Sequence, residues 1–345
     1  MRRPDPIPAT SQLGFCVLTM HNGGVDTPTD VLGDAWTCRT LHLKDDPATR
    51  RTGIEPVATL VSQRDVDPGR VAVLWVHGFV DYFFHDHLAA PLAAAGYQLY
   101  GLDLRDCGRS YQEGRAINDT DNLARYTEEI DRSVRELGLV HGKVVVAAHS
   151  TGGLTTALWA DARPYLVSRG TLAALVLNSP WLDLRAGRWA KTVASVGSDL
   201  VGRVAPRTVV THLGEHYGKA LHVDTGGEWD YNLDWKSHES PPVTAGFVRS
   251  VRQAQTRVAH GLDITCPVLV LASDSSGPHD RHHDDLVTTD CVLDVADIER
   301  LAPRLGADVT FKQVERGAHD LSLSPSPARE SFVDTMITFL DARTR

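Results

Sequence analysis

"VVVAAHSTGGL", residues 144–154, decides how this chain folds. The valines and alanines form a short apolar run typical of a buried strand, and a helix-like pattern begins after His-Ser-Thr-Gly-Gly. A serine on such a corner exposes its hydroxyl at the carboxyl end of the strand. The backbone N–H groups after it stand at a helix N-terminus, where they can stabilise an anion. The stretch therefore predicts that Ser150 is a nucleophile; the alternative is a serine in an ordinary turn.

The corner is also tight, so the residues two before and two after the serine must be small. Ala148 and Gly152 occupy these two positions. The usual signature is G-x-S-x-G, so Ala148 departs from it by one methyl group, which such corners tolerate.

Similar apolar runs recur along the chain. They are continuous rather than alternating, as expected for strands covered on both faces. Segments with helical patterns separate them, and this alternation predicts an α/β fold with a mostly parallel sheet flanked by helices. Two stretches near the start, 36–43 and 55–64, fit a pair of antiparallel strands. The runs lie at 70–78, 98–104, 143–150, 172–180 and 266–273.

Residues 184–261 interrupt the alternation because they contain no convincing buried strand. Residues 245–262 read as a helix, and a second helical stripe precedes them. We predict a helical lid over 184–261, inserted into a core made of residues 1–183 and 262–345. The stripe consists of Trp189, Val193, Val196 and Leu200.

Two further motifs fit a serine nucleophile. "HGF", residues 77–79, follows a predicted strand, and the backbone N–H of Phe79 can form an oxyanion hole with that of Thr151. We expect His77 to shape this turn rather than to transfer protons. "GAHD", residues 317–320, follows the last predicted strand, so His319 can reach the serine as its general base.

A carboxylate must orient this histidine. Several aspartates follow the strand at 266–273, and the residues alone leave the choice among them open. The candidates are Asp274, Asp280, Asp284, Asp285, Asp290 and Asp294.

These motifs together resemble the α/β-hydrolase superfamily, and within it the monoacylglycerol lipase and serine aminopeptidase-like (lysophospholipase-like) branch. The resemblance covers about residues 70–320. It rests on the nucleophile and histidine motifs, on "HGF", and on "DLRDCGRS" (103–110), "CPVLVLAS" (266–273) and "DCVLD" (290–294). Members carry a D-x-hydrophobic-x-D element with the catalytic aspartate first. This implies Asp290, which lies 29 residues before His319, with Asp274 as the alternative.

The resemblance implies a serine hydrolase that cleaves carboxylic esters, either monoacylglycerol-like or with short acyl or aryl groups, through an acyl-enzyme and without a cofactor. Two alternatives stay open. An aminopeptidase or amidase would need acidic lid residues to hold a substrate ammonium, and Glu215, Glu228 and Asp230 are available. The other alternative is a catalytically inactive member that serves as a binding module.

Composition narrows the partners of this 345-residue chain. A net charge of −9 argues against nucleic acid and anionic membrane surfaces, and no apolar run is long enough for stable membrane insertion. Five cysteines without a CxxC motif predict a reduced, cytoplasmic compartment. We expect the His- and Asp-rich stretch 277–285 to be a solvated loop rather than a metal site. No feature indicates an oligomeric state.

Overall fold

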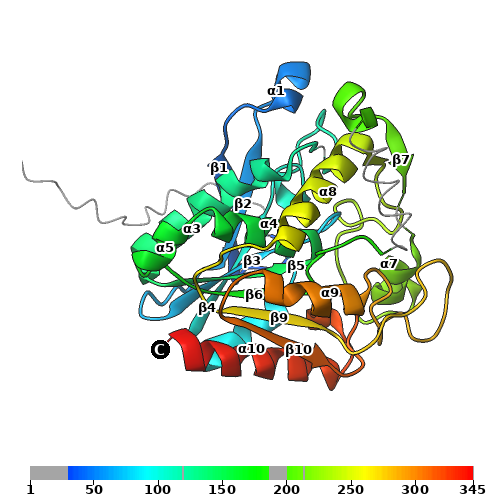
Figure 1. The fold of residues 1–345 in the computed structure, drawn as a ribbon. Coiled ribbons are helices and arrows are strands. Elements are labelled where there is room, and N and C mark those ends of the chain that lie inside the picture. Colours follow the sequence, from blue (N-terminus) through cyan, green and yellow to red (C-terminus); the bar gives the residue numbers. More distant parts are fainter. Residues whose placement is uncertain (1–29, 119, 186–199, 213, 345) are drawn as a thin grey trace, which may run out of the picture.

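The computed structural model describes residues 30–118, 120–185, 200–212 and 214–344. Its centre is an eight-stranded sheet in the order β1-β2-β4-β3-β5-β6-β9-β10 (Figure 1). The six strands from β4 to β10 run parallel, whereas β2 pairs antiparallel with β1 and β4. The predicted mostly parallel sheet is confirmed. The strands are β1 (Trp36–His42), β2 (Val57–Gln63), β3 (Val71–Val76), β4 (Tyr97–Asp103), β5 (Val144–His149), β6 (Leu172–Asn178), β9 (Val268–Ser273) and β10 (Val309–Val314).

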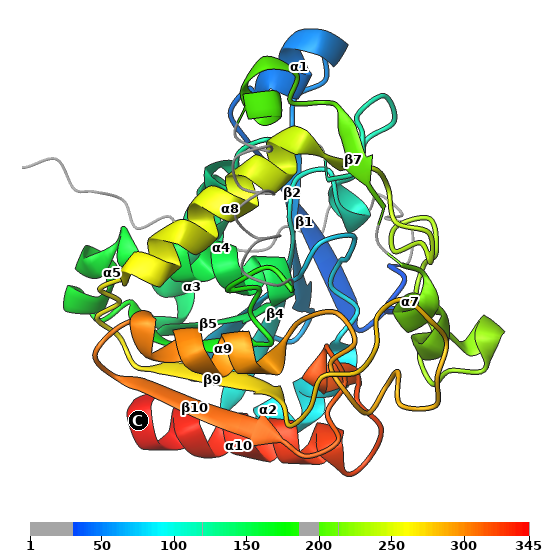
Figure 2. The same ribbon diagram turned by 45° about the vertical axis from the view of Figure 1, so that its right-hand side comes forward.

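Helices cover both faces of the sheet (Figures 1 and 2). Alternate residues of β5 explain why the strands read as continuous apolar runs: Val144 and Val146 pack into the core on one face, and Val145 and Ala147 into the core on the other. The first face carries α3 (Thr127–His141), α4 (Ser150–Asp161), α8 (Ala245–His260) and α9 (Val295–Leu301), and the second carries α2 (Ala89–Ala94) and α10 (Ala328–Thr344).

The remaining elements are short. They include three short α-helices, one of which is α7 (His216–Leu221), and a ribbon of β7 (Val209–Thr211) and β8 (Val243–Thr244). The other two α-helices are α1 (Pro47–Thr52) and α5 (Pro164–Ser168). The 3₁₀ turns are Asp86–Leu88, Gly108–Ser110, Leu123–Tyr126, Val223–Thr225, Ala302–Arg304 and Leu321–Leu323.

Two described parts of the region predicted as a lid differ in their placement. Helix α8 packs on α4, and its Phe247, Val251 and Val258 lie in the same buried cluster as the sheet. Residues 216–244 instead lie over the carboxyl ends of the strands, close to Ser150. Of the predicted apolar stripe, Trp189, Val193 and Val196 lie outside the described residues, and Leu200 is 68% exposed. The lid boundaries stay a prediction.

Among the described residues, no helix is both long and apolar enough to cross a membrane. Cys38, Cys107, Cys266 and Cys291 carry free thiols, and the last three are buried.

Candidate active site

Ser150 lies at the turn from β5 into α4, with a left-handed φ of +53°. This conformation is uncommon for a residue with a side chain, and such strain is concentrated at functional sites. A Cβ atom on Gly152 would lie 2.2 Å from the carbonyl oxygen of His77, so the small residue after the serine is required by a backbone contact. Ala148 is fully buried in the core, which accommodates its methyl group.

Ser150 and His319 meet at the carboxyl edge of the sheet. The Nε2 atom of His319 lies 3.1 Å from Ser150 Oγ, and its Nδ1 atom lies 3.0 Å from Asp290 Oδ2. All three side chains are buried. Ser150 Oγ is therefore within hydrogen-bond reach of an imidazole whose other nitrogen faces a carboxylate, an arrangement that can activate a serine hydroxyl.

Asp290 is held as an anion. The backbone N–H groups of Val292 and Leu293 donate to its Oδ1 at 2.9 and 2.7 Å. Burial acts to raise the pKa of Asp290, but His319 and these two amides outweigh burial and lower the pKa below its usual value. The carboxylate is thus available to accept the Nδ1–H of His319.

The other five aspartates considered for this position point elsewhere. Asp274 is exposed at the end of β9, and its Oδ1 accepts a hydrogen bond from Arg316 N at 3.1 Å. Asp294 caps α9 by accepting from Ala296 N. The remaining three are exposed; they are Asp280, Asp284 and Asp285. Of the six, Asp290 is the one whose carboxylate lies against His319.

The two amides expected to bind an oxyanion both belong to residues that line the cavity at Ser150. Thr151 is in the first turn of α4, so its N–H has no acceptor within the helix. Phe79 lies in the turn after β3, where Val80 takes a strained φ of +51°.

His77 shapes this turn through both ring nitrogens. Its Nε2 accepts from Leu104 N at 3.0 Å, so its Nδ1 carries the proton and donates to Gly78 O at 2.7 Å. Burial lowers the pKa of His77. A neutral ring with both nitrogens occupied has the turn-shaping role expected from the sequence.

A cavity of about 350 Å³ opens beside Ser150. One part of its wall is apolar, and polar groups from α7 and the segment after it form another part. The apolar side chains include Phe79, Trp181, Leu184, Val243, Phe247 and Leu293, and the polar ones include Asp81, Tyr217, Lys236, Ser237 and His238.

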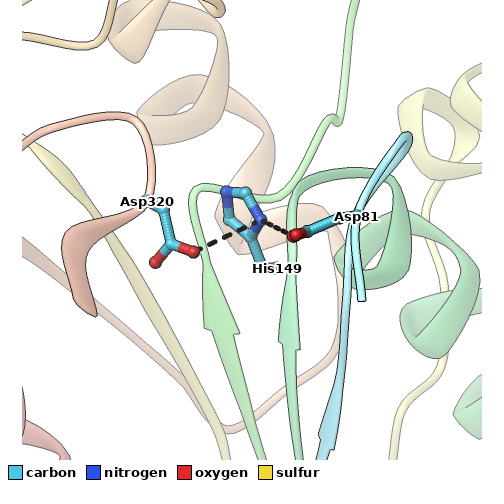
Figure 3. Close-up of side chains that lie close together, drawn as sticks. All are labelled: Asp81, His149 and Asp320. Atoms are coloured by element: carbon cyan, nitrogen blue, oxygen red, sulfur yellow. Dashed lines mark ion pairs between the residues drawn. The ribbon is translucent and has the colours of Figure 1, made fainter. Parts of the chain in front are cut away.

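A cluster of charged or titratable groups lies next to the serine and was not anticipated from the sequence; its Asp81, His149 and Asp320 are buried (Figure 3). His149 Nδ1 lies 3.8 Å from Asp81 Oδ2 and 3.7 Å from Asp320 Oδ2. Lys236 Nζ lies 2.7 Å from Asp81 Oδ1. Sequence position offered a signal, because His149 adjoins Ser150 and Asp320 adjoins His319.

The same cluster is the place where a metal ion would find donors. The three ligand atoms of Asp81, His149 and Asp320 lie within 4.8 Å of one another, and no other group of three or more His, Cys, Asp or Glu in the described parts of the chain meets this spacing. The ammonium of Lys236 already neutralises Asp81, so we assign no metal here. With the residues that the structure describes, the histidines of 277–285 form no such group.

A family model described as serine aminopeptidase, S33 (Hydrolase_4) matches residues 67–325. The chain belongs to this family. A monoacylglycerol lipase of Mycolicibacterium smegmatis is 27% identical over 215 residues, which cover 61% of this chain and 71% of that protein.

Solved structures show the same fold. A monoglyceride lipase from Saccharomyces cerevisiae has a TM-score of 0.64 at 15% identity, covering 89% of this chain and 96% of its own. A carboxyl esterase from Bacillus coagulans has a TM-score of 0.60 at 12% identity, with coverages of 90% and 100%. The chain is therefore a hydrolase with the α/β-hydrolase fold, similar to lipases and esterases, as the sequence motifs predicted.

Proposed function

We propose that this chain is a serine hydrolase that cleaves carboxylic esters, either monoacylglycerol-like or with short acyl or aryl groups. Ser150 is the nucleophile, His319 the general base and then acid, and Asp290 the residue that orients the imidazole. The observation that carries this proposal is the hydrogen-bonded chain from Ser150 Oγ through His319 to Asp290, at 3.1 and 3.0 Å.

In this mechanism His319 removes the Ser150 proton as the oxygen attacks the acyl carbon. The backbone N–H groups of Phe79 and Thr151 stabilise the tetrahedral oxyanion. His319 then protonates the leaving alcohol, and an acyl-enzyme forms. Water that His319 activates hydrolyses the acyl-enzyme. Asp290 stabilises the imidazolium in both halves of the reaction, and the steps require no cofactor.

The wall of the cavity favours an ester over a peptide with a free amino group. Glu215 and Glu228, which could hold a substrate ammonium, form ion pairs with Lys219 and Arg329. Neither lines the cavity. Among the described lining residues the acidic one is Asp81, and Lys236 already neutralises it. The name of the Mycolicibacterium smegmatis relative supports the same choice.

The apolar part of the wall suits an acyl chain. Phe79, Trp181 and Phe247 are the bulkiest apolar side chains of the lining, and the ring centroids of Phe79 and Phe247 lie 4.6 Å apart. We also propose a cytoplasmic location, supported by the free thiols of the four described cysteines.

A fluorophosphonate probe and a series of p-nitrophenyl esters test the proposal. Wild-type protein should be labelled on Ser150, whereas Ser150→Ala should lose labelling and several orders of magnitude of ester turnover with little change in stability. Ser168→Ala, on the exposed end of α5, is the matched control. A folded Ser150→Ala protein with full activity would contradict the proposal, and unlabelled wild type would favour the inactive binding module.

A further inference from the structure

Four charged or titratable side chains from separate segments meet beside the catalytic corner. Asp81 follows β3, His149 ends β5, Asp320 follows β10, and Lys236 comes from the segment over the sheet edge. All but Lys236 are buried, and only 15% of the Lys236 side chain is exposed. Figure 3 shows His149 between the two carboxylates.

The carboxylates need positive partners because burying an uncompensated anion is costly. Asp81 Oδ1 has the Lys236 ammonium at 2.7 Å, whereas Asp81 Oδ2 and both ring nitrogens of His149 have no hydrogen-bond partner among the described residues. When His149 is protonated, the four side chains carry equal numbers of negative and positive charges: two carboxylates against one ammonium and one imidazolium. Burial acts to lower the pKa of His149, but Asp320 and Asp81 outweigh it and raise the pKa.

The surroundings of His149 contain few other titratable groups. His77 and His85 both belong to the segment after β3 and lie near Asp81, and His85 Nε2 lies 3.0 Å from Asp320 Oδ2. From the segment above, the hydroxyl of Tyr217 accepts a hydrogen bond from Asp320 N at 2.9 Å. Burial raises the pKa of Tyr217, which keeps this hydroxyl neutral.

The cluster adjoins the proposed general base. The ring centroids of His149 and His319 lie 4.8 Å apart, and those of Tyr217 and His319 lie 5.9 Å apart in a T-shaped pair. At such separations, a charge strongly changes the free energy of protonating a neighbouring imidazole. Any net charge in the cluster therefore acts on the step in which His319 accepts the Ser150 proton.

We propose that Asp81, His149, Asp320 and Lys236 form a charge-balanced network that sets the pH range in which His319 acts as a general base. The proposal rests on the proposed function and assigns these four residues a positioning and electrostatic role. Removing one positive charge leaves the network negative, which favours a protonated, inactive His319. Removing one negative charge has the opposite effect.

The pH dependence of kcat/KM on a p-nitrophenyl ester separates these effects. In Lys236→Met and His149→Gln the acidic limb should move to higher pH, and in Asp81→Asn to lower pH, each by about one unit or more. Loss of packing alone would lower activity without moving the limb in opposite directions. Lys219→Met, which breaks an exposed ion pair on α7, and Asp308→Asn, at an exposed pair with Arg343, are the matched controls.

Two measurements keep the outcomes distinct. Fluorophosphonate labelling reports on Ser150 itself: unlabelled wild type removes the proposed function, whereas labelled variants with unmoved limbs overturn only the network. If Asp81→Asn does not fold, the upward shift of Lys236→Met, with His149→Gln beside it, decides the question. Activity lost to EDTA and restored by Zn²⁺ would overturn the network in favour of a metal ion, and activity indifferent to both supports it.

Discussion

Asp290 illustrates how a single residue acquires its role from its surroundings. It accepts from two backbone amides through one oxygen and from the His319 ring through the other. Asp274 has the same side chain but is exposed, and it accepts a hydrogen bond from the backbone N–H of Arg316. The family resemblance favoured Asp290, whereas the residues alone left both open, because the sequence does not give the path of the insertion that separates β9 from this carboxylate.

The difference predicts opposite outcomes for two matched substitutions. Asp290→Asn removes the anion that sets the tautomer of His319 and stabilises its charged form, so kcat near neutral pH should fall by about 10⁴. Asp274→Asn should lower kcat by less than about tenfold, because this side chain is exposed and bonds to the backbone of a turn. Steady-state kinetics on one p-nitrophenyl ester measures both. An active Asp290→Asn together with a disabled Asp274→Asn would reverse the assignment.

Elements are where sequence and structure agree most closely. Strand β5 and the corner at Ser150 could be predicted because an apolar run and a turn with small residues are local patterns. The close contact that makes Gly152 necessary could not, since it depends on how the loop after β3 crosses the start of α4. Sequence shows that a small residue is present, and the fold supplies the neighbouring atom.

Gly152→Ala tests this contact between elements. The new methyl would meet the carbonyl oxygens of His77 and Val76 at 2.2 and 2.8 Å, so the loop that carries Phe79 must shift. We expect a loss of about 1–3 kcal/mol in the free energy of unfolding and a fall in kcat. Gly69→Ala, where the nearest atom is a flexible aspartate side chain at 3.2 Å, is the control for urea denaturation and kinetics. Equal effects at both glycines would refute the argument.

At the scale of the whole molecule, the fold assembles groups that no local pattern joins. Asp81, His149, Lys236 and Asp320 are far apart in the chain, and all but Lys236 lie at or after the carboxyl ends of strands that meet at one edge of the sheet. Lys236 comes from a segment with little regular structure. A sequence-based analysis can place the neighbours of Ser150 and His319, but it has no periodicity from which to predict the position of Lys236.

The segment that carries Lys236 continues into β8, where Val243 leads to a prediction about selectivity for acyl-chain length. Val243 contributes to the apolar wall of the cavity, so Val243→Trp should shorten the space for an acyl chain. Turnover of p-nitrophenyl octanoate should fall at least about tenfold relative to acetate, because loss of a few buried methylenes is worth this much. Val209→Trp, at an exposed position on the same ribbon, is the control. An unchanged octanoate-to-acetate ratio would mean that the acyl chain lies elsewhere.

The response of the whole fold to acid follows from its paired carboxylates, and Asp46 offers the clearest case. It caps α1, accepting from Thr49 N at 2.9 Å and from Arg115 Nη2 at 2.7 Å. Burial acts to raise the pKa of Asp46, but these hydrogen bonds outweigh burial and lower it to about 2. Because the folded-state pKa is depressed, the stabilisation is complete above the unfolded value of about 4 and is lost as pH falls toward 2.

Asp46→Asn removes the titrating group and leaves Arg115 without that charged partner. Its unfolding temperature should therefore lie furthest below that of the wild type between pH 5 and 7, and the gap should narrow as pH falls from about 4 to 2. Asp308→Asn, at an exposed pair with Arg343, should give a small gap throughout. Thermal denaturation of the three proteins across this range measures both gaps. A gap that stays constant or widens in acid would show that Asp46 stabilises the fold without its charge, through the cap geometry of α1 alone.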